Sequence, residues 1–172
     1  MTNKPAAPYT YIAEPKTEDT DQMLAIFKSG QTPHHEKFPD IFCEANDDIG
    51  ISRYLQSFMK PRNPFRTRRK FALGWFVENQ LRGYLLYHLA NTSDVFFGNE
   101  RWVCYVEDIA VDGQSRSAGG ASQLMEGLLA HVGPLKNCLV SAQVWRGNTA
   151  SRALFEKFQF TDHSETFYRI IE

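Results

Sequence analysis

Residues 105–121 read YVEDIAVDGQSRSAGGA, which predicts the end of a strand over 102–111, a tight turn and the beginning of a helix. The strand carries two acids, Glu107 and Asp108, and residues 117–121, which follow Arg116, are all small. The first N–H groups of a helix have no partners within the helix and lie at the positive end of its dipole. A helix that begins after a strand and a turn of small residues is therefore suited to bind a phosphate group.

The sequence on either side of this stretch predicts further strands and helices. After it come a helix with one apolar face over 121–132, a strand over 139–145, a helix over 149–158 and a closing strand over 165–171. Before it, the expected elements are a strand at 9–13, helices that begin at 17–21 and at 47–48, a hairpin of 71–77 and 81–90 around the turn 78–80, and a polar connection over 91–100. This succession predicts an α+β or mixed α/β fold.

Three segments allow more than one interpretation. Residues 30–39 contain two prolines and the pair His34-His35, and they predict an exposed loop with surface histidines rather than a metal site. The stripe of apolar and aromatic residues over 51–59 is interpreted as core packing, with a wall of a substrate pocket as the alternative. The five basic residues of 62–70 predict a solvated loop, with an anion site as the alternative.

Composition places the chain among globular proteins with a single domain, residues 1–172. Apolar residues make up 42% of the chain, which is enough to form a core, and the formal net charge is -1. This balance gives no general attraction to nucleic acid or to a membrane. Cys43, Cys104 and Cys138 form no CxxC pair, and no apolar run approaches the roughly 20 residues that span a bilayer. We expect a cytoplasmic protein with no metal and no nucleic-acid or membrane partner.

Two motifs resemble those of a known superfamily. The pattern Arg116-x-x-Gly119-x-Ala121 after an apolar strand resembles the acyl-CoA signature of the GNAT N-acetyltransferases. Residues 148–160, NTASRALFEKFQF, resemble the second motif of that superfamily, in which an Asn opens a helix that ends in an aromatic pattern. The order and the separation of the two motifs agree with the superfamily over the second half of the chain, and the first 60 residues resemble it loosely.

The resemblance implies a fold, a co-substrate and a set of binding residues. The implied fold is a central, mostly antiparallel sheet of about six to seven strands flanked by about four helices. The single acyl-CoA N-acyltransferase domain would carry its cofactor half at about 102–160 and would use acetyl-CoA as co-substrate. The residues implied to contact acetyl-CoA are Ile109, Ala110, Val111, Arg116, Ser117, Ala118, Gly119, Gly120, Ala121, Ser122, Asn148 and Phe155. Backbone groups of the first three would pair with the pantetheine arm, and the N–H groups of 116–122 would hold the pyrophosphate. Asn148 is also expected to act as a helix N-cap, and the two roles are compatible.

The two acids of the strand are the candidate bases. Neighbouring residues of a strand point to opposite faces, so at least one acid should face the interior or a cleft unless a bulge intervenes. A carboxylate in reach of the substrate can accept the proton of an ammonium group. The stretch also resembles the corresponding strand of spermidine/spermine-type acetyltransferases, which implies Glu107 as the general base. Asp108 is the alternative base.

The second motif departs from the superfamily at the position of the proton donor. A tyrosine that is often proposed to protonate the leaving thiolate is replaced by Phe155. Tyr168 is the first candidate to substitute for it, with Tyr87, Tyr105 and His88 as further candidates.

The sequence therefore predicts an N-acetyltransferase that moves an acetyl group from acetyl-CoA to a primary amine of a small molecule or peptide by direct attack in a ternary complex. The loss of the tyrosine at Phe155 keeps a second hypothesis open, a catalytically weak acyl-CoA-binding or sensing module. A nucleic-acid-binding domain that uses 62–70 is disfavoured by the neutral charge balance. A homodimer is a further expectation, because dimers are common among the proteins that the chain resembles.

Overall fold

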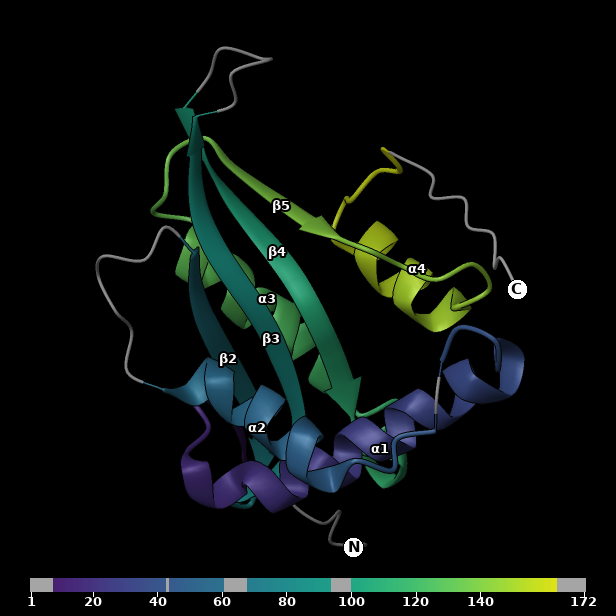
Figure 1. The fold of residues 1–172 in the computed structure, drawn as a ribbon. Coiled ribbons are helices and arrows are strands. Elements are labelled where there is room, and N and C mark those ends of the chain that lie inside the picture. The colour runs from purple at the N-terminus through teal and green to yellow at the C-terminus, as the bar shows by residue number, and fades with distance from the viewer. Residues whose placement is uncertain (1–7, 43, 61–67, 94–99, 164–172) are drawn as a thin grey trace, which may run out of the picture.

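The computed structural model describes residues 8–42, 44–60, 68–93 and 100–163 (Figure 1). In chain order its elements are β1 (Thr10–Ala13), the 3-10 turn η1 (Thr17–Asp19), α1 (Thr20–Lys37), α2 (Asp48–Met59), β2 (Arg68–Val77), β3 (Gln80–Ser93), β4 (Glu100–Val111), the 3-10 turn η2 (Gly113–Ser115), α3 (Gly120–Val132), β5 (Cys138–Ala142) and α4 (Thr149–Lys157).

The strands form a mixed sheet in the order β1-β2-β3-β4-β5. The first four strands are antiparallel neighbours, and β5 runs parallel to β4 because α3 provides the crossover connection. The predicted mixed α/β fold with a mostly antiparallel sheet and about four helices is confirmed. The described part of the chain has five strands, fewer than the six to seven expected. The expected closing strand over 165–171 lies outside the described residues.

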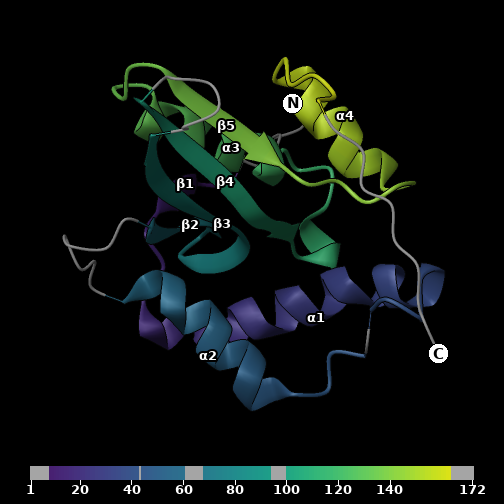
Figure 2. The ribbon, with the colours of Figure 1, turned by 45° about the horizontal axis from the view of Figure 1, so that its top comes forward.

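Helices cover both faces of this sheet (Figures 1 and 2). On one face, α1 and α2 pack Met23, Ile26, Leu55 and Phe58 against the sheet, where Tyr84 and Leu86 of β3 point toward them. On the other face, α3 packs Leu124, Met125, Leu128 and Val132 against Leu85 and Tyr87 of β3. Successive side chains of β3 thus point into two different cores, as the two-residue period of a strand requires. The first of these faces carries the candidate site.

The predicted hairpin is confirmed, although β2 begins three residues earlier and β3 runs from Gln80 to Ser93. Its tight turn places Glu78 and Asn79 at positive φ, 49° and 66°. Two consecutive residues in that region form the turn that matches the twist of the flanking strands. The polar turn recognised in the sequence therefore sets the register of the two long central strands.

The predicted loop over 30–39 is wrong for most of its length, because α1 continues to Lys37. Pro33 lies inside the helix and removes one backbone donor, which is the reason why the sequence suggested a loop. The chain around the end of α1 packs on the segment after β5: the rings of Phe42 and Trp145 lie 4.6 Å apart. Lys37 Nζ also donates to the carbonyl of Gly147 at 3.4 Å. Tertiary contacts of this kind routinely override local propensity.

Candidate active site

The sheet opens between β4 and β5. These strands pair in parallel from Trp102 and Cys138 to Val106 and Ala142, and the pairing ends there although β4 continues to Val111. Figure 1 shows the two arrows diverging beyond this point. The predicted strand over 139–145 correspondingly ends three residues early. The backbone groups on the facing sides of the two strands are therefore free of one another beyond Val106.

A β-bulge lies at the point where the strands separate. Leu86 of β3 faces Asp108 and Tyr87 faces Val106, so Glu107 is an extra residue without a partner on β3. A bulge interrupts the alternation of side chains along a strand. As a result, Glu107 reaches His88 and Asp108 reaches Tyr84, two side chains that lie on the same face of β3. Both acids thus face α1 and α2.

Asp108 is partly buried and hydrogen-bonded. The hydroxyl of Tyr84, itself fully buried, donates to Asp108 Oδ2 at 2.7 Å. Burial raises the pKa of the Asp108 carboxyl above its ordinary value, and the hydrogen bonds from Tyr84 and from the Ile109 backbone oppose this shift. This carboxylate is therefore held firmly in the floor of the site.

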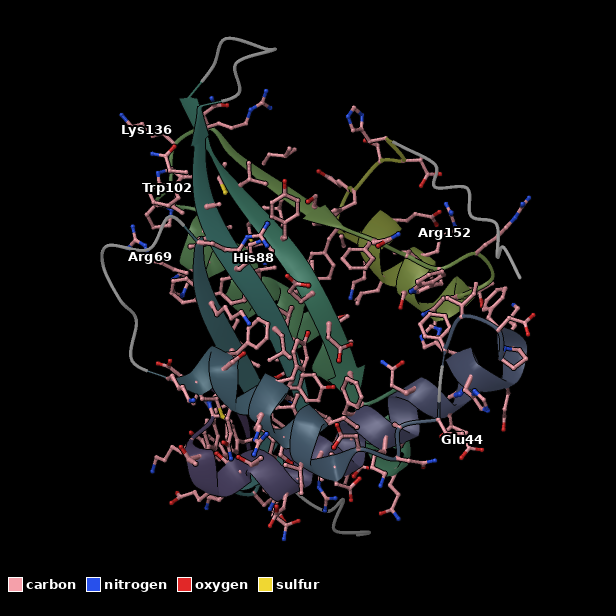
Figure 3. All side chains as sticks on the ribbon, viewed as in Figure 1. Glu44, Arg69, His88, Trp102, Lys136 and Arg152 are labelled. Carbon is pink, nitrogen blue, oxygen red and sulfur yellow. The ribbon has the colours of Figure 1, made fainter. Side chains whose placement is uncertain are left out.

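Glu107 is more accessible than its neighbour. Its side chain is 37% exposed, and its Oε1 lies 2.6 Å from Nδ1 of His88, a β3 residue that is only 3% exposed (Figure 3). Burial lowers the pKa of the His88 imidazole, and the positive charges of Arg68 and Lys70 lower it further, while Glu107 opposes both effects. The ring of Tyr105 stacks on the imidazole at 4.8 Å. The accessible acid is thus anchored by a buried histidine.

A cavity of about 550 Å³ opens onto both carboxylates. Its walls come from α1, α2, residues 106–109 of the bulged strand, the segment after β5, and the first turns of α4. Asp47 lies on the same cavity, and among the described lining residues there is no lysine or arginine. A cavity with three acidic side chains and no lysine or arginine favours a cationic ligand such as an ammonium group. A smaller cavity of about 290 Å³ beside α1 and the β2–β3 turn contains the paired residues Arg82 and Asp112 and lacks such a carboxylate pair.

Tyr54 shows that the 51–59 stripe combines its two interpretations, core packing and a cavity wall. It belongs to the stripe of α2 that was interpreted as core packing, and its ring does contact Phe27 and Phe58. It also lines the cavity, where burial and then the charges of Asp108 and Glu107 raise the pKa of its hydroxyl. Helical spacing identifies the inward face of a helix, but a core and a cavity wall show the same spacing.

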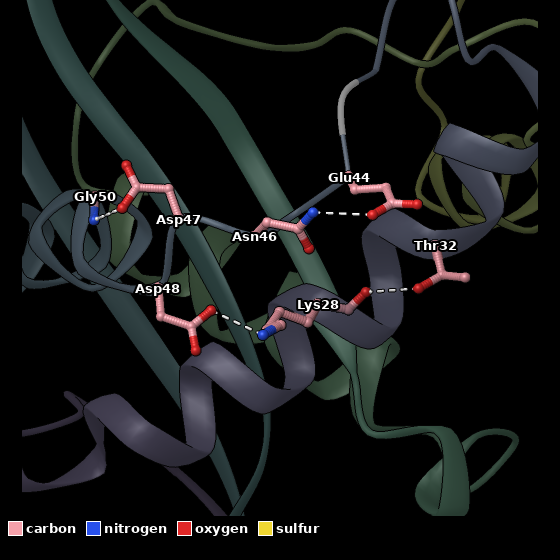
Figure 4. A network of polar contacts seen from close by, with 7 residues as sticks. All are labelled: Lys28, Thr32, Glu44, Asn46, Asp47, Asp48 and Gly50. Carbon is pink, nitrogen blue, oxygen red and sulfur yellow. Dashed lines mark hydrogen bonds and ion pairs between the residues drawn. The ribbon is translucent and has the colours of Figure 1, made fainter.

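The position of α2 over the cavity is set by polar contacts at its beginning (Figure 4). The Asp47 carboxylate accepts a hydrogen bond from the Gly50 N–H at 2.8 Å and so caps the helix. Asp48 forms an ion pair with Lys28 of α1 at 2.8 Å. The predicted helix start at these two acids is confirmed: Asp47 caps α2, and Asp48 links α2 to α1.

The turn before α3 contains two residues in the left-handed region of φ. Gly119, the N-cap of α3, has φ 83°, and Ser117 has φ 66°. No foreign atom lies within 4 Å of the position that a Cβ would take on Gly119, so the space in front of the helix is open. A Cβ on Gly120 would instead overlap the Trp75 ring. Lys157 of α4 donates to Ser122 Oγ at 2.8 Å and adds positive charge beside the first turn. The free N–H groups of this turn therefore face an open, electropositive position.

The second motif meets the cavity through Asn148 and Phe155. Asn148 caps α4 by accepting a hydrogen bond from the Ser151 N–H at 3.1 Å, and it also lines the cavity. The prediction that it is a helix N-cap is confirmed. Phe155, 7% exposed, lines the same cavity and packs on Phe160. Tyr168 lies outside the described residues, and neither Tyr87 nor Tyr105 lines the cavity.

The remaining candidates lie apart from the carboxylates or outside the described residues. His34 lines the cavity, and burial lowers its pKa, whereas the neighbouring His35 contacts the Phe42 carbonyl. Within residues 8–42, 44–60, 68–93 and 100–163, no three His, Cys, Asp or Glu side chains are grouped as metal ligands. Most of the basic segment 62–70 lies outside the described residues.

Comparison with known proteins places this fold and site in a family. A model of the acetyltransferase (GNAT) family matches residues 32–160. The chain therefore belongs to the GNAT acetyltransferase family, and acyl transfer is its general chemistry. A search of curated protein sequences gives no significant match.

Solved structures show the same fold at low sequence identity. A tetramutant of a Bacillus halodurans protein has a TM-score of 0.80 and 16% identity, over 94% of this chain and 99% of that one. A ribosomal-protein-alanine N-acetyltransferase of Brucella melitensis biovar Abortus has a TM-score of 0.61 and 18% identity, over 95% of this chain and 99% of that one. An aminoglycoside acetyltransferase from an uncultured soil metagenomic sample has a TM-score of 0.65 and 16% identity, over 95% and 97%.

No helix in the described part of the chain is long and apolar enough to cross a membrane.

Proposed function

We propose that this chain is an N-acetyltransferase that moves the acetyl group of acetyl-CoA to a primary amine of a small molecule or peptide by direct attack in a ternary complex. The observation that carries the proposal is the bulged carboxylate pair, Glu107 and Asp108, at the point where β4 and β5 separate. An acid-lined cavity without a described lysine or arginine begins there. The geometry thus supports an amine acceptor beside a slot for an extended thioester arm.

The described residues fit acetyl-CoA along its length. We assign the pantetheine arm to the free edge of β4 at Ile109, Ala110 and Val111, where it would take the place of a strand. The open turn of residues 116–122 and the first N–H groups of α3 suit the pyrophosphate, with Lys157 as an additional cation. Asn148 and Phe155 lie on the cavity between these two positions. The bound co-substrate supplies an activated acetyl group.

Glu107 is the general base in this proposal. An alkyl ammonium has a pKa of about 10.4, so only about one amine in a few thousand is neutral at pH 7. A carboxylate within hydrogen-bond reach can accept the proton as the amine attacks. Glu107 is accessible from the cavity, whereas Asp108 is partly buried and already accepts the Tyr84 hydroxyl. Asp108 then serves as a fixed negative charge that favours the cationic substrate.

Phe155 cannot protonate the leaving thiolate, and Tyr168 remains the proposed proton donor. The thiol of CoA is a good leaving group, so turnover continues at a reduced rate even without a donor. The free cysteines Cys104 and Cys138 suit a reducing compartment, and this supports a cytoplasmic location for the reaction.

Thermal unfolding with and without acetyl-CoA tests the co-substrate site before any amine is chosen. Acetyl-CoA at about 100 times its Kd should add about 2.7 kcal/mol, which raises Tm by about 5–10 °C for a domain of this size. Gly119→Glu should abolish this shift because a carboxylate would occupy the cradle. Gly113→Glu is the matched control, since nothing lies within 4 Å of its added Cβ and it precedes the cradle.

A panel of amines assayed for CoA release then separates the enzyme from a binding module. Release that depends on an added amine supports the transferase. Stabilisation by acetyl-CoA without release from any amine favours the acyl-CoA-binding or sensing module, which Phe155 keeps as the second candidate. The absence of any shift at millimolar acetyl-CoA contradicts both.

A further inference from the structure

The contact between Glu107 and His88 is not part of either sequence motif. It exists because the bulge turns Glu107 toward β3, where His88 Nδ1 lies 2.6 Å from Glu107 Oε1. His88 is 3% exposed, so its ring is fixed by the surrounding structure. The Glu107 side chain has three rotatable bonds of its own and is 37% exposed. The buried imidazole of His88 therefore restrains the more flexible side chain of Glu107.

The surroundings of His88 determine which protons it carries. Burial lowers the pKa of the imidazole, and the charges of Arg68 and Lys70 on β2 act in the same direction. Glu107 on β4 raises it, and Tyr105 on the same strand contributes a stacked ring. The net direction is downward, so the imidazole is neutral at pH 7 and carries one proton.

That single proton belongs on Nδ1. A carboxylate oxygen only accepts hydrogen bonds, so a nitrogen 2.6 Å away must be the donor. Both ring nitrogens are buried and neither makes a well-aligned hydrogen bond to a described residue, but Glu107 Oε1 is an acceptor that lies close to Nδ1. A neutral ring with its proton on Nδ1 gives Glu107 a directed donor and leaves the negative charge on the carboxylate.

We infer that His88 is a positioning residue for the reaction: its Nδ1–H holds Glu107 Oε1 and so directs the second carboxylate oxygen toward the amine. The inference rests on the proposed function, because it assigns a task to the same base. His88 does not line the cavity and does not touch the substrate. It acts through Glu107, as Tyr84 acts on Asp108.

Three variants separate positioning from a general structural role. His88→Leu removes the donor, and we expect kcat to fall about tenfold or more, as part of the 10²–10⁴ that a general base contributes. The KM values for amine and acetyl-CoA should stay within about twofold, because neither ligand contacts His88. His88→Asn places an amide N–H near the former Nδ1 and should restore much of kcat. Tyr11→Phe, on β1 and away from the cavity, is the control that leaves kcat unchanged.

A double-mutant cycle shows whether His88 acts through Glu107. In a Glu107→Gln background, His88→Leu should lower kcat by less than about twofold, because the residue that it positions is already lost. Equal effects of His88→Leu in both backgrounds would overturn the inference. So would a fall in kcat that His88→Asn fails to reverse.

A spectroscopic measurement does not depend on turnover. Nitrogen-15 NMR of the wild-type protein should show the His88 ring neutral at pH 7 with its proton on Nδ1, with the signal assigned by its loss in His88→Asn. In Glu107→Gln the pKa of His88 should fall, because the carboxylate that raised it is gone. A ring protonated on Nε2 overturns the inference even in an active enzyme. A wild-type protein that releases no CoA with any amine contradicts the proposed function while this measurement still decides the state of the pair.

Discussion

Asp108 is stabilised in the floor of the site by a tyrosine hydroxyl rather than by a positive charge. Burial raises its pKa above the ordinary 3.8, so the folded state holds this proton more tightly than the unfolded chain. The stability that Asp108 contributes is therefore full below pH 3.8 and is lost as the pH rises through its folded pKa. Relative to Asp108→Asn, which has no proton to lose, the wild type should lose free energy of unfolding as the pH rises toward neutrality. Denaturant unfolding at several pH values measures this difference.

The exposed Asp40 is the matched position for this measurement. Asp40→Asn controls for the removal of one carboxylate at an exposed position. A difference between wild type and Asp108→Asn that stays constant with pH would show that burial does not disfavour the charged form of Asp108.

Replacing Glu107 should lower the activity, because Glu107 and not Asp108 is the proposed base. Glu107→Gln keeps the shape of the side chain and removes its ability to accept a proton, so kcat should fall by about 10²–10⁴. The thermal stabilisation by acetyl-CoA should be unchanged, because Glu107 is not assigned to the co-substrate. Glu126→Gln, an exposed glutamate of α3, controls for the loss of one negative charge. Unchanged kcat in Glu107→Gln would move the role of base to another residue.

The two acids also show where sequence reasoning reaches its limit at the residue scale. Their presence in an apolar strand predicted a functional pair, and the alternation rule was stated with a bulge as its exception. The bulge depends on the pairing of β3 with β4, which no local pattern reveals. His88 was named only as a substitute proton donor, and core packing was preferred for Tyr54, because burial against a partner strand or helix looks the same as core packing in the sequence.

Among the elements, α3 depends on two neighbouring glycines for different reasons. Gly119 needs its positive φ, whereas Gly120 needs the absence of a side chain next to Trp75, a residue only 1% exposed. Gly120→Ala should destabilise the protein by about 1–3 kcal/mol through overpacking. This loss should appear although alanine has the higher helix propensity. Denaturant unfolding gives the free energy directly.

Gly127 in the same helix provides the comparison. The nearest foreign atom to an added Cβ there is a methyl carbon of Ile12 at 3.1 Å, which can shift. Gly127→Ala has the same gain in propensity and should cost less than Gly120→Ala. If the two variants were equally stable, steric overlap with Trp75 would not be the reason for the glycine.

The elements themselves were largely predictable from periodicity and turn residues. The hairpin around residues 78–80, the helix after Gly119 and the cap at Asn148 all follow from local chemistry. Two boundaries were predicted wrongly: α1 extends further than expected, and β5 ends earlier. Both boundaries depend on contacts between residues far apart in the sequence. Both errors involve the contact between Phe42 and Trp145, which joins segments about a hundred residues apart.

For the whole molecule, the sheet separates two cores, and the co-substrate is proposed to bind along only one part of it. Acetyl-CoA should therefore slow amide hydrogen exchange at the end of β4, the turn before α3 and the beginning of α4. Exchange in β1 and the β2–β3 hairpin should change little, because these strands lie on the far side of β4 from the gap. Exchange followed by mass spectrometry would show this pattern. Uniform protection of every element would indicate global stabilisation instead of a site between β4 and β5.

The motifs predicted the architecture of the molecule more fully than its acceptor site. Residues 102–160 carry both motifs, and the fold around them agrees with the family. The proposed acceptor side is built in part from α1 and α2, whose sequences predicted only helices, so the acid-lined cavity emerged only from their packing on the sheet. The homodimer stays a prediction.

The gap between β4 and β5 has a consequence for solubility. Beyond Val106 and Ala142, β4 and the segment after β5 no longer pair, so each has a free edge within the sheet. A strand edge with unpaired backbone groups can pair with another polypeptide. Native sheets usually protect such edges with charges, bulges or covering segments. Here, in our proposal, a small molecule provides that protection whenever it is bound. The supply of the co-substrate would then govern how readily this protein aggregates, in addition to how fast it works.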